Sequence, residues 1–308
     1  MTPPQHRNRH RQSLPALRAS LAALATVTLL AACGGGAGAG PEHSAPSRSA
    51  APASRTPTRP SAAPSTRSRA EIDADVARVV RSVPDGAAAV SAVNIDTGAS
   101  YTAGYRKPIW TASMYKLLVL ETLLRQQGPL SGGTLAEART MIENSDNAAG
   151  WSLWQAGGGN TGLQATLRAL KATHSTADGT DPTFTRMTAA DAVRMVRALV
   201  RPGVLSAAAR RQALQLMRNV EADQRWGVGA AADKGTDVAN KNGWLSIDNS
   251  NPAGEDDGGR WAVNSVGVVT VHGQQVLMAA MSMHNASLQD GITVIQALAK
   301  DAAAVVAP

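Results

Sequence analysis

The stretch from residue 113 to about residue 126 most constrains how this chain can fold. Nearly every position in it is a good helix former. Apolar side chains recur on almost all sides of the predicted helix: Met114, Leu117, Leu118, Val119, Leu120, Leu123 and Leu124. A helix that is apolar all round has to be buried. We therefore expect a central helix around which the rest of the domain packs.

The first turn of this helix carries a hydroxyl and an amine. Ser113 and Lys116 are three residues apart, a spacing that stacks two side chains on one helix face with Cβ atoms about 5–6 Å apart. Burial and the positive end of the helix dipole both disfavour a charged lysine, so we expect a lowered pKa and an amine that can take a proton from Ser113. Alternatively, Ser113 only caps the helix and Lys116 snorkels to solvent. A capping box, however, has Glu or Gln where this chain has Lys116.

The first 70 residues have the pattern of an export signal followed by a linker. Residues 1–19 contain arginines but no acid, and residues 20–32 form an apolar run too short for a permanent membrane span. That run ends in Leu30-Ala31-Ala32-Cys33-Gly34, which resembles the bacterial lipoprotein processing box. We expect a signal peptide at 1–32, lipidation of Cys33, and an extracytoplasmic lipoprotein anchored to the bacterial cell membrane. Cys33 is the only cysteine, so no disulfide can form within the chain.

Residues 33–70 are predicted to be a disordered tether, and residues 71–308 the folded domain. The tether is rich in Pro, Ser and Ala and has no large apolar side chain that could repay the entropy of ordering. The signal and tether also hold all of the excess positive charge, which leaves residues 71–308 with a net charge of about −1. We therefore expect no nucleic-acid partner.

The patterns along the domain predict an α/β fold. Strands are expected at 87–94, 100–105, 238–248, 261–271 and 274–283. Helices are expected at 71–82, in three stretches between 131 and 170, after Thr188, after Ser206, and at 288–306. The first and last strands can pair into one antiparallel sheet flanked by helices, with a small all-helical lobe between them in sequence.

Two further polar motifs follow the Ser-x-x-Lys pair. Ser145-Asp146-Asn147 precedes a helical run and alone would be an N-cap. Lys241-Asn242-Gly243 alone would be a hairpin turn, because Asn-Gly is the strongest short hairpin signal. A metal site is not expected, since the histidines of the domain lack ligand spacing such as H-E-x-x-H.

Together, in this order, the three motifs resemble the signature of the penicillin-recognising serine hydrolases, and within them the class A β-lactamases. The resemblance covers residues 71 to about 303 and implies a β-lactamase/transpeptidase-like fold. It implies that Ser113 is a nucleophile acylated by a β-lactam or a D-Ala-D-Ala-type peptide, with Lys116 as its base and Ser145 passing a proton to the leaving nitrogen. No cofactor is implied, and we expect a monomer.

The same resemblance implies the substrate contacts. Asn147 would bond the acyl-amide side chain and Lys241 would attract the substrate carboxylate. Gly243 would let the substrate approach the strand, and the backbone N–H groups of Ser113 and Trp244 would form the oxyanion hole.

The chain departs from the class A pattern in three ways. Asn242 stands where a Thr or Ser is usual, so its amide would have to bind the carboxylate. Only 32 positions separate Ser113 from Ser145, which predicts a small helical lobe and an open cleft. The loop at 174–187 has no Glu to serve as deacylation base. Asp181 is the nearest substitute, although it also fits a solvated loop residue before a proline turn.

These departures leave the activity open. Acylation is better supported than hydrolysis of the acyl-enzyme, and the pattern does not separate a β-lactamase from a DD-peptidase. The alternative from another class is a tethered module that binds or senses cell-wall peptide or β-lactam without turning it over.

Overall fold

The computed structural model describes residues 67–248 and 257–308. The predicted signal peptide, Cys33 and the predicted tether up to residue 66 lie outside the described residues. Within the described ranges, no helix combines the length and the apolar character needed to cross a membrane.

A five-stranded antiparallel sheet in the order β2-β1-β7-β6-β5 forms the centre of the domain. The strands are β1 (Ala88–Asn94), β2 (Ser100–Gly104), β5 (Ala239–Ile247), β6 (Arg260–Val271) and β7 (Gln274–Asn285). Strand β1 pairs with β7 in the register Ala88↔Ser282. The prediction that the first and last strands of the domain join in one antiparallel sheet is therefore confirmed.

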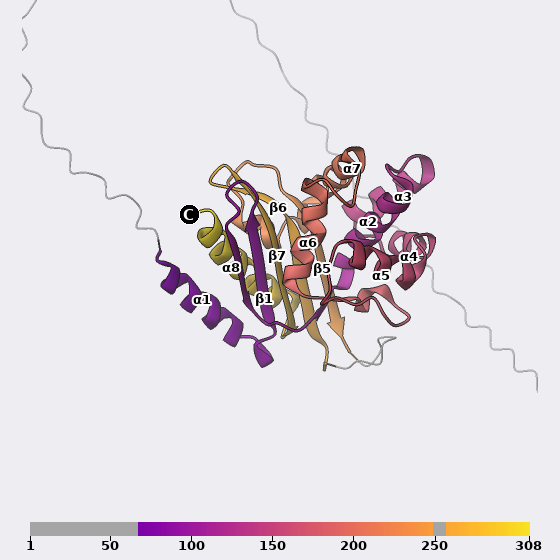
Figure 1. Ribbon diagram of the computed structural model, residues 1–308. Coiled ribbons are helices and arrows are strands. Elements are labelled where there is room, and N and C mark those ends of the chain that lie inside the picture. Colours follow the sequence, from indigo (N-terminus) through magenta and orange to yellow (C-terminus); the bar gives the residue numbers. More distant parts are fainter. Residues whose placement is uncertain (1–66, 249–256) are drawn as a thin grey trace, which may run out of the picture. The chain divides into compact units, whose positions relative to one another are not determined.

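The sheet is buried on both faces. Successive residues of β7 alternate between two hydrophobic cores, since Leu277, Ala279 and Met281 belong to one and Val276, Met278 and Ala280 to the other. Helices α1 (Arg69–Arg81) and α8 (Leu288–Val306) cover the second face, and α6 (Ala189–Val200) covers the first (Figure 1). This two-period alternation is what a strand between two helical layers requires.

The helical lobe lies beside α6 and is built around α2 (Tyr115–Gln127) (Figure 1). Its other helices are α3 (Gly132–Glu143), α4 (Asn147–Ala156), α5 (Gly159–Ala169) and α7 (Ala207–Arg218). Ten consecutive residues of α2, from Tyr115 to Leu124, are buried, which confirms the expected central helix. The α-helix begins two residues later than expected, because Ser113 lies in the preceding 3-10 turn η2 (Ala112–Met114).

Most short elements of the domain were not predicted, apart from the turns expected at Pro84-Asp85-Gly86 and at the proline after Asp181, which are η1 (Pro84–Gly86) and η3 (Pro182–Phe184). Strands β3 (Ile109–Trp110) and β4 (Arg186–Met187) pair with each other in a separate two-stranded sheet. The remaining 3-10 turns are η4 (Ala222–Gln224) and η5 (Gly227–Ala231). Elements of two to five residues are too short to carry a hydrophobic period, so only the turns marked by Pro or Gly could be predicted.

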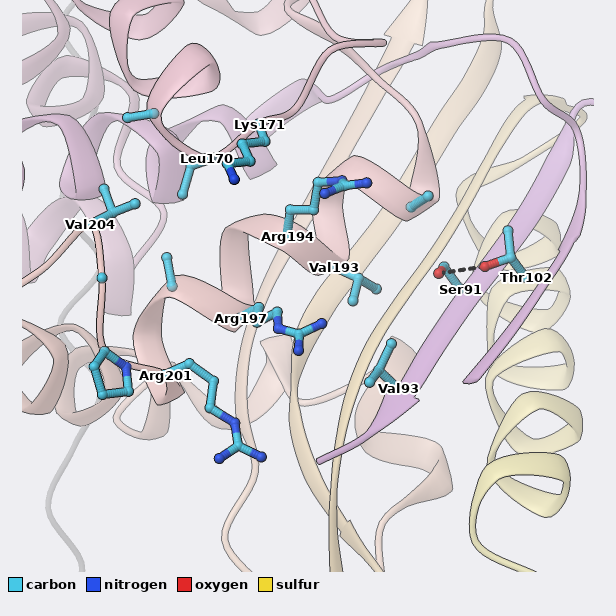
Figure 2. Close-up of a pocket in the computed structure, with 15 residues that line it drawn as sticks. Ser91, Val93, Thr102, Leu170, Lys171, Val193, Arg194, Arg197, Arg201 and Val204 are labelled. Atoms are coloured by element: carbon cyan, nitrogen blue, oxygen red, sulfur yellow. Dashed lines mark hydrogen bonds between the residues drawn. The ribbon is translucent and has the colours of Figure 1, made fainter. Parts of the chain in front are cut away.

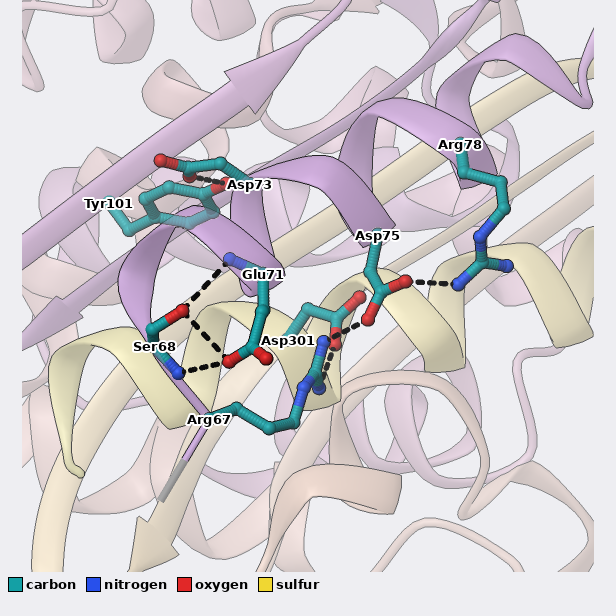
Figure 3. Close-up of polar contacts among 8 residues, drawn as sticks. All are labelled: Arg67, Ser68, Glu71, Asp73, Asp75, Arg78, Tyr101 and Asp301. Atoms are coloured by element: carbon teal, nitrogen blue, oxygen red, sulfur yellow. Dashed lines mark hydrogen bonds and ion pairs between the residues drawn. The ribbon is translucent and has the colours of Figure 1, made fainter. Parts of the chain in front are cut away.

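The folded part begins earlier than residue 71. Ser68 caps α1 in a capping box with Glu71. The Arg67 guanidinium donates to Asp301 of α8 at 2.7 Å and also pairs with Asp75 (Figure 3). The described end of the predicted tether, residues 67–70, is therefore part of the domain. The sequence pattern did not predict this earlier start of the domain, because helix capping and ion pairing involve polar side chains and leave no hydrophobic period.

Candidate active site

The turn that carries Ser113 is held from two sides. The side-chain amide of Asn264, on β6, donates to the backbone oxygens of Trp110 at 2.8 Å and Thr111 at 3.2 Å. Ala112 has a left-handed backbone, with φ of 46°. Such a conformation is costly for a non-glycine residue and persists only where its surroundings enforce it. Ser113 makes no capping hydrogen bond to η2 or α2, so the interpretation of Ser113 as a helix cap is wrong.

Strand β5 runs directly against this turn, and Gly243 makes the approach possible. A Cβ at Gly243 would lie 2.6 Å from the backbone nitrogen of Met114 and 3.0 Å from that of Ser113. The absence of a side chain at Gly243 thus makes room for the backbone of η2, whereas we expected it to make room for a substrate. Lys241-Asn242-Gly243 is buried inside β5, so the interpretation as a hairpin turn is also wrong.

The Lys116 amine lies at the centre of a hydrogen-bond network. Its Nζ donates to Ser113 Oγ at 3.0 Å, to the backbone oxygen of Ser145 at 2.6 Å and to Asn147 Oδ1 at 2.7 Å. Ser145 Oγ lies 3.4 Å away. The side chain reaches this position past α4, where a Cβ at Gly150 would lie 2.8 Å from Lys116 Cε. Gly150 belongs to none of the three motifs, so its role beside Lys116 was not predicted.

Burial lowers the pKa of Lys116 to about 8, against an opposing effect of the Asp146 carboxylate. Lys116 is completely buried, and desolvation disfavours its charged form. The expectations of a buried lysine and a lowered pKa agree with the structure.

Ser145 links the two lysines of the site. Lys241 Nζ donates to Ser145 Oγ at 2.8 Å and to the backbone oxygen of Asn242 at 3.0 Å. Ser145 has a left-handed backbone, with φ of 57°, and the next residue, Asp146, caps α4 by accepting from the backbone N–H of Ala149. The motif therefore both caps a helix and supplies a side chain to the site. Burial and the neighbouring Lys116 hold the pKa of Lys241 well below its usual range.

Ser113 opens into a cavity of about 420 Å³. The cavity is lined by Ser113, Asn144, Ser145, Asn147, Glu221, Asp223, Gln224, Trp226, Trp244 and Leu288. The indole rings of Trp226 and Trp244 meet edge to face, with centroids 5.7 Å apart. The three segments of the chain that carry the motifs thus meet at this cavity: Ser113, Ser145 and Asn147 line it, and the amines of Lys116 and Lys241 are hydrogen-bonded to those residues. The cavity has the size of a small-molecule site.

The family model described as the beta-lactamase enzyme family matches residues 134–306, which is more than half of the chain. This protein belongs to the beta-lactamase enzyme family. The match includes the Ser145 and Lys241 motifs and begins after Ser113 and Lys116. No curated protein matches the chain.

Solved structures share the β-lactamase fold of this family member. PBP-A is 19% identical with a TM-score of 0.62, and the match covers 77% of this chain and 96% of PBP-A. A mutant of PBP-A, solved as an acyl-enzyme complex with penicillin G, has the same identity and TM-score, with 78% and 97% covered. A β-lactamase from Xanthomonas campestris is 16% identical with a TM-score of 0.63, and 76% and 97% are covered. At these identities the likeness establishes the fold alone.

In this member of the β-lactamase family, the side chain of Asn242 is not free to bind a substrate carboxylate. Its side chain is buried, and its Nδ2 donates to the backbone oxygens of Gln224 at 2.8 Å and Trp226 at 3.3 Å. Its Oδ1 accepts from Asn240 at 3.1 Å. The amide therefore holds the segment that leads into η5 against β5, and the prediction that it binds a substrate carboxylate is wrong.

Asp181 is also engaged elsewhere. Its Oδ1 accepts from the backbone N–H of Thr183 at 2.8 Å and from the Thr183 hydroxyl at 2.7 Å, which caps η3. Asp181 is not among the residues that line the Ser113 cavity. The structure thus favours the alternative of a loop aspartate before a proline turn over a deacylation base.

Several cavity residues were missed by sequence analysis. Glu221, Asp223 and Trp226 come from the segment around η4, which carries no motif, and Leu288 comes from the start of α8. Glu221 accepts a hydrogen bond from the Asn144 side chain, which ties this segment to the end of α3. Only tertiary packing brings these residues to the site.

Proposed function

We propose that this member of the beta-lactamase enzyme family is a serine hydrolase that is acylated at Ser113 by β-lactams or D-Ala-D-Ala-type peptides. The observation that carries the proposal is the 3.0 Å contact between Ser113 Oγ and the buried Lys116 amine, whose pKa burial lowers to about 8. A nucleophilic serine needs an adjacent base with a pKa near the working pH.

The partners of Lys116 fit a neutral amine. A neutral Nζ has two N–H bonds and one lone pair. The backbone oxygen of Ser145 and Asn147 Oδ1 can accept the two N–H bonds, at 2.6 and 2.7 Å. The lone pair is then left for the hydroxyl proton of Ser113. The three contacts that hold a charged Lys116 thus also suit the neutral amine. When Lys116 loses one proton, it can act as a general base toward Ser113.

The acylation step follows from this arrangement. Ser113 Oγ attacks the amide carbonyl while its proton passes to Lys116. When the C–N bond breaks, Ser145 Oγ gives its proton to the leaving nitrogen and takes one from Lys116, so that an ester and a free amine result. Lys241 Nζ donates to Ser145 Oγ and so orients that hydroxyl. A substrate carboxylate beside this amine would favour its protonated form, against the burial and the neighbouring Lys116 that lower its pKa. The backbone N–H groups of Ser113 and Trp244 would bind the oxyanion, a contact typically worth about 10²–10³ in rate. Asn147 Nδ2, which has no hydrogen bond to any described residue, is available for the acyl-amide group.

We further propose that deacylation is slow. Hydrolysis of the ester needs a base that activates a water molecule for attack on the acyl carbon. The Asp181 carboxylate already accepts two hydrogen bonds from Thr183 in η3. Glu221 and Asp223 line the cavity on the η4 segment. Glu221 already accepts from Asn144, and Asp223 is exposed, with no hydrogen bond to a described side chain that would hold it in position as a base. The acyl-enzyme should therefore accumulate. PBP-A, which shares the fold, forms such a complex with penicillin G as a mutant.

Mass spectrometry after incubation with penicillin G tests the proposal. We expect a covalent adduct on the wild type that is absent from Ser113→Ala and retained in Ser131→Ala, because Ser131 is exposed and its side chain caps nothing. Saturable penicillin binding that survives Ser113→Ala, with no adduct on the wild type, would instead establish the non-catalytic binding or sensing module.

Export and anchoring through Cys33 are a separate proposal that rests on the sequence. Metabolic labelling of the expressing bacterium with a fatty acid should label the wild type and not Cys33→Ser. Equal labelling of both proteins would contradict it.

A further inference from the structure

A second cavity, of about 590 Å³, lies between α6, the loop after α5 and the β1–β2 end of the sheet (Figure 2). Four cationic side chains line it: Lys171, Arg194, Arg197 and Arg201. Its lining contains no Asp or Glu, and it shares no residue with the Ser113 cavity. The proposed acylation chemistry does not use it.

The three arginines form a row. Their positions on α6 and at its end are three and four residues apart, a spacing that places side chains on one helix face. With a rise of about 1.5 Å per residue, the row extends about 10 Å along the helix axis. Figure 2 shows Arg194, Arg197 and Arg201 leaving the helix one after another, with Arg197 reaching toward Val93 of β1.

The positive charge of the row is only partly compensated. Arg194 lies 3.3 Å from Asp191, whose carboxylate also accepts from the backbone N–H of His174 and the Ser175 hydroxyl. Arg201 donates to the backbone oxygen of Ile95, which carries no net charge. The side chains of Arg197 and Lys171 make no ion pair or hydrogen bond with any of the residues 67–248 and 257–308, and only the backbone atoms of these two residues are hydrogen-bonded. Like charges gathered in one cavity repel each other, and an anion between them would relieve that repulsion.

Strands β1 and β2 form the wall opposite the row. Val93 contributes methyl groups to this wall, and Ser91 and Thr102 share a hydrogen bond there at 2.8 Å (Figure 2). Val193 adds methyl groups from α6 itself. The cavity therefore offers cationic donors along one side and apolar contact on the other. A guanidinium matches phosphate oxygens with two parallel N–H bonds, and one phosphoryl group can engage more than one arginine.

We propose that this cavity is a binding site for an elongated ligand with two or more phosphoryl groups. The length of the row fits several phosphoryl groups in succession rather than a single small anion. Such groups occur in soluble oligophosphates and in the headgroups of phospholipids such as cardiolipin, and the shared chemistry is the multiple phosphate.

Calorimetric titration of full-length protein with inorganic tripolyphosphate at low salt tests the site. The protein carries Cys33→Ser so that no lipid anchor interferes. We expect saturable binding at one site that weakens about tenfold in Arg197→Gln, in keeping with the loss of a hydrogen bond to a charged group. The matched control is Arg211→Gln, because Arg211 is an exposed arginine of α7 outside the cavity. It should bind like the parent.

A second arm identifies the source of the phosphates. Phosphatidylcholine vesicles with and without cardiolipin are sedimented with the same three proteins. Binding to cardiolipin vesicles that Arg197→Gln alone reduces supports a lipid headgroup, whereas binding of tripolyphosphate alone supports a soluble ligand. The proposal is overturned if neither probe binds, if both variants weaken binding equally, or if citrate binds as tightly as tripolyphosphate. None of these outcomes depends on acylation of Ser113.

Discussion

At the scale of single residues, the pKa of Lys116 fixes the pH dependence of acylation. Burial lowers this pKa to about 8, and the neutral amine is the form that can accept the Ser113 proton. Below pH 8 the neutral fraction falls about tenfold per pH unit, so the acylation rate should rise with pH and level off above about 8. Stopped-flow acylation by penicillin G between pH 5.5 and 9.5 measures this profile.

Lys116→Arg provides the control for that profile. A guanidinium keeps its charge at every accessible pH and cannot act as the base. We expect acylation to fall by at least about 10² with no remaining rise near pH 8, in keeping with the loss of a positioned proton acceptor. An unchanged profile in this variant would mean that another group is titrating.

Glu121 is a buried acid that takes no part in the proposed chemistry. It is completely buried in α2, neither carboxylate oxygen has a hydrogen-bond partner in the described residues, and burial raises its pKa well above the ordinary value. Because the folded state holds the proton more tightly than the unfolded state, its contribution to stability is full below about pH 4.5 and is lost as the pH rises through the folded pKa.

The prediction is that Glu121→Gln, which cannot ionise, is more stable than the wild type at pH 7. Its advantage should grow from about pH 4.5 by up to about 1.4 kcal/mol per pH unit, for as long as the folded carboxyl stays protonated. Urea unfolding at several pH values gives the two free energies of unfolding. A difference that does not change with pH would contradict the assignment.

At the scale of elements, the close contact between β5 and η2 is what sets the position of Ser113. Gly243→Ala would push its methyl group onto the backbone of Thr111 and Met114, neither of which can move without shifting the nucleophile. A misplacement of about 1 Å can cost on the order of 10²-fold in rate. We expect at least that loss in acylation by penicillin G, together with a lower thermal midpoint. Gly133→Ala is the control, because a Cβ there meets nothing within 4 Å and an alanine favours helix α3.

The sequence predicted the long elements and the motif residues, because each of these signals lies within one element. The hydrophobic periods of the long elements predicted α2, α6, α8 and all five strands of the main sheet to within about two residues, since burial dictates those periods. The motif residues Ser113, Lys116, Ser145 and Lys241 were predicted as a group, and the structure brings them into hydrogen-bond contact. Local chemistry was sufficient where one element carries the signal.

What sequence reasoning missed depends on contacts between elements. Asn242 follows Lys241 in the motif, yet its amide is satisfied by backbone oxygens some 16–18 positions earlier in the chain. Asp181 has a suitable carboxyl group, yet a neighbouring threonine occupies it. Gly150 and the η4 segment matter only because α4 and η4 pack beside Lys116 and Ser145. No spacing along the chain encodes such neighbours.

At the scale of the whole folded domain, two hydrophobic cores share one sheet. The active-site lobe packs on one face, while α1 and α8 pack on the other, where Ile72 and Val76 of α1 are buried. Strand β7 contributes alternate side chains to both cores, so the two cores share one backbone element. Although the domain is larger than the small domains that usually unfold in one step, this shared strand predicts a single cooperative transition.

Ile72→Ala tests this coupling from the face opposite Ser113. Removing a buried isoleucine typically costs about 2–5 kcal/mol, so the thermal midpoint should fall by several degrees. The temperature at which a fluorescent penicillin ceases to label Ser113 should fall by the same amount as the midpoint followed by circular dichroism, although Ile72 touches nothing in the site. If labelling survived above the circular dichroism transition, or failed well below it, the lobe and the α1–α8 layer would be unfolding separately. Coincident shifts would mean that the geometry of the nucleophile depends on packing across the entire sheet.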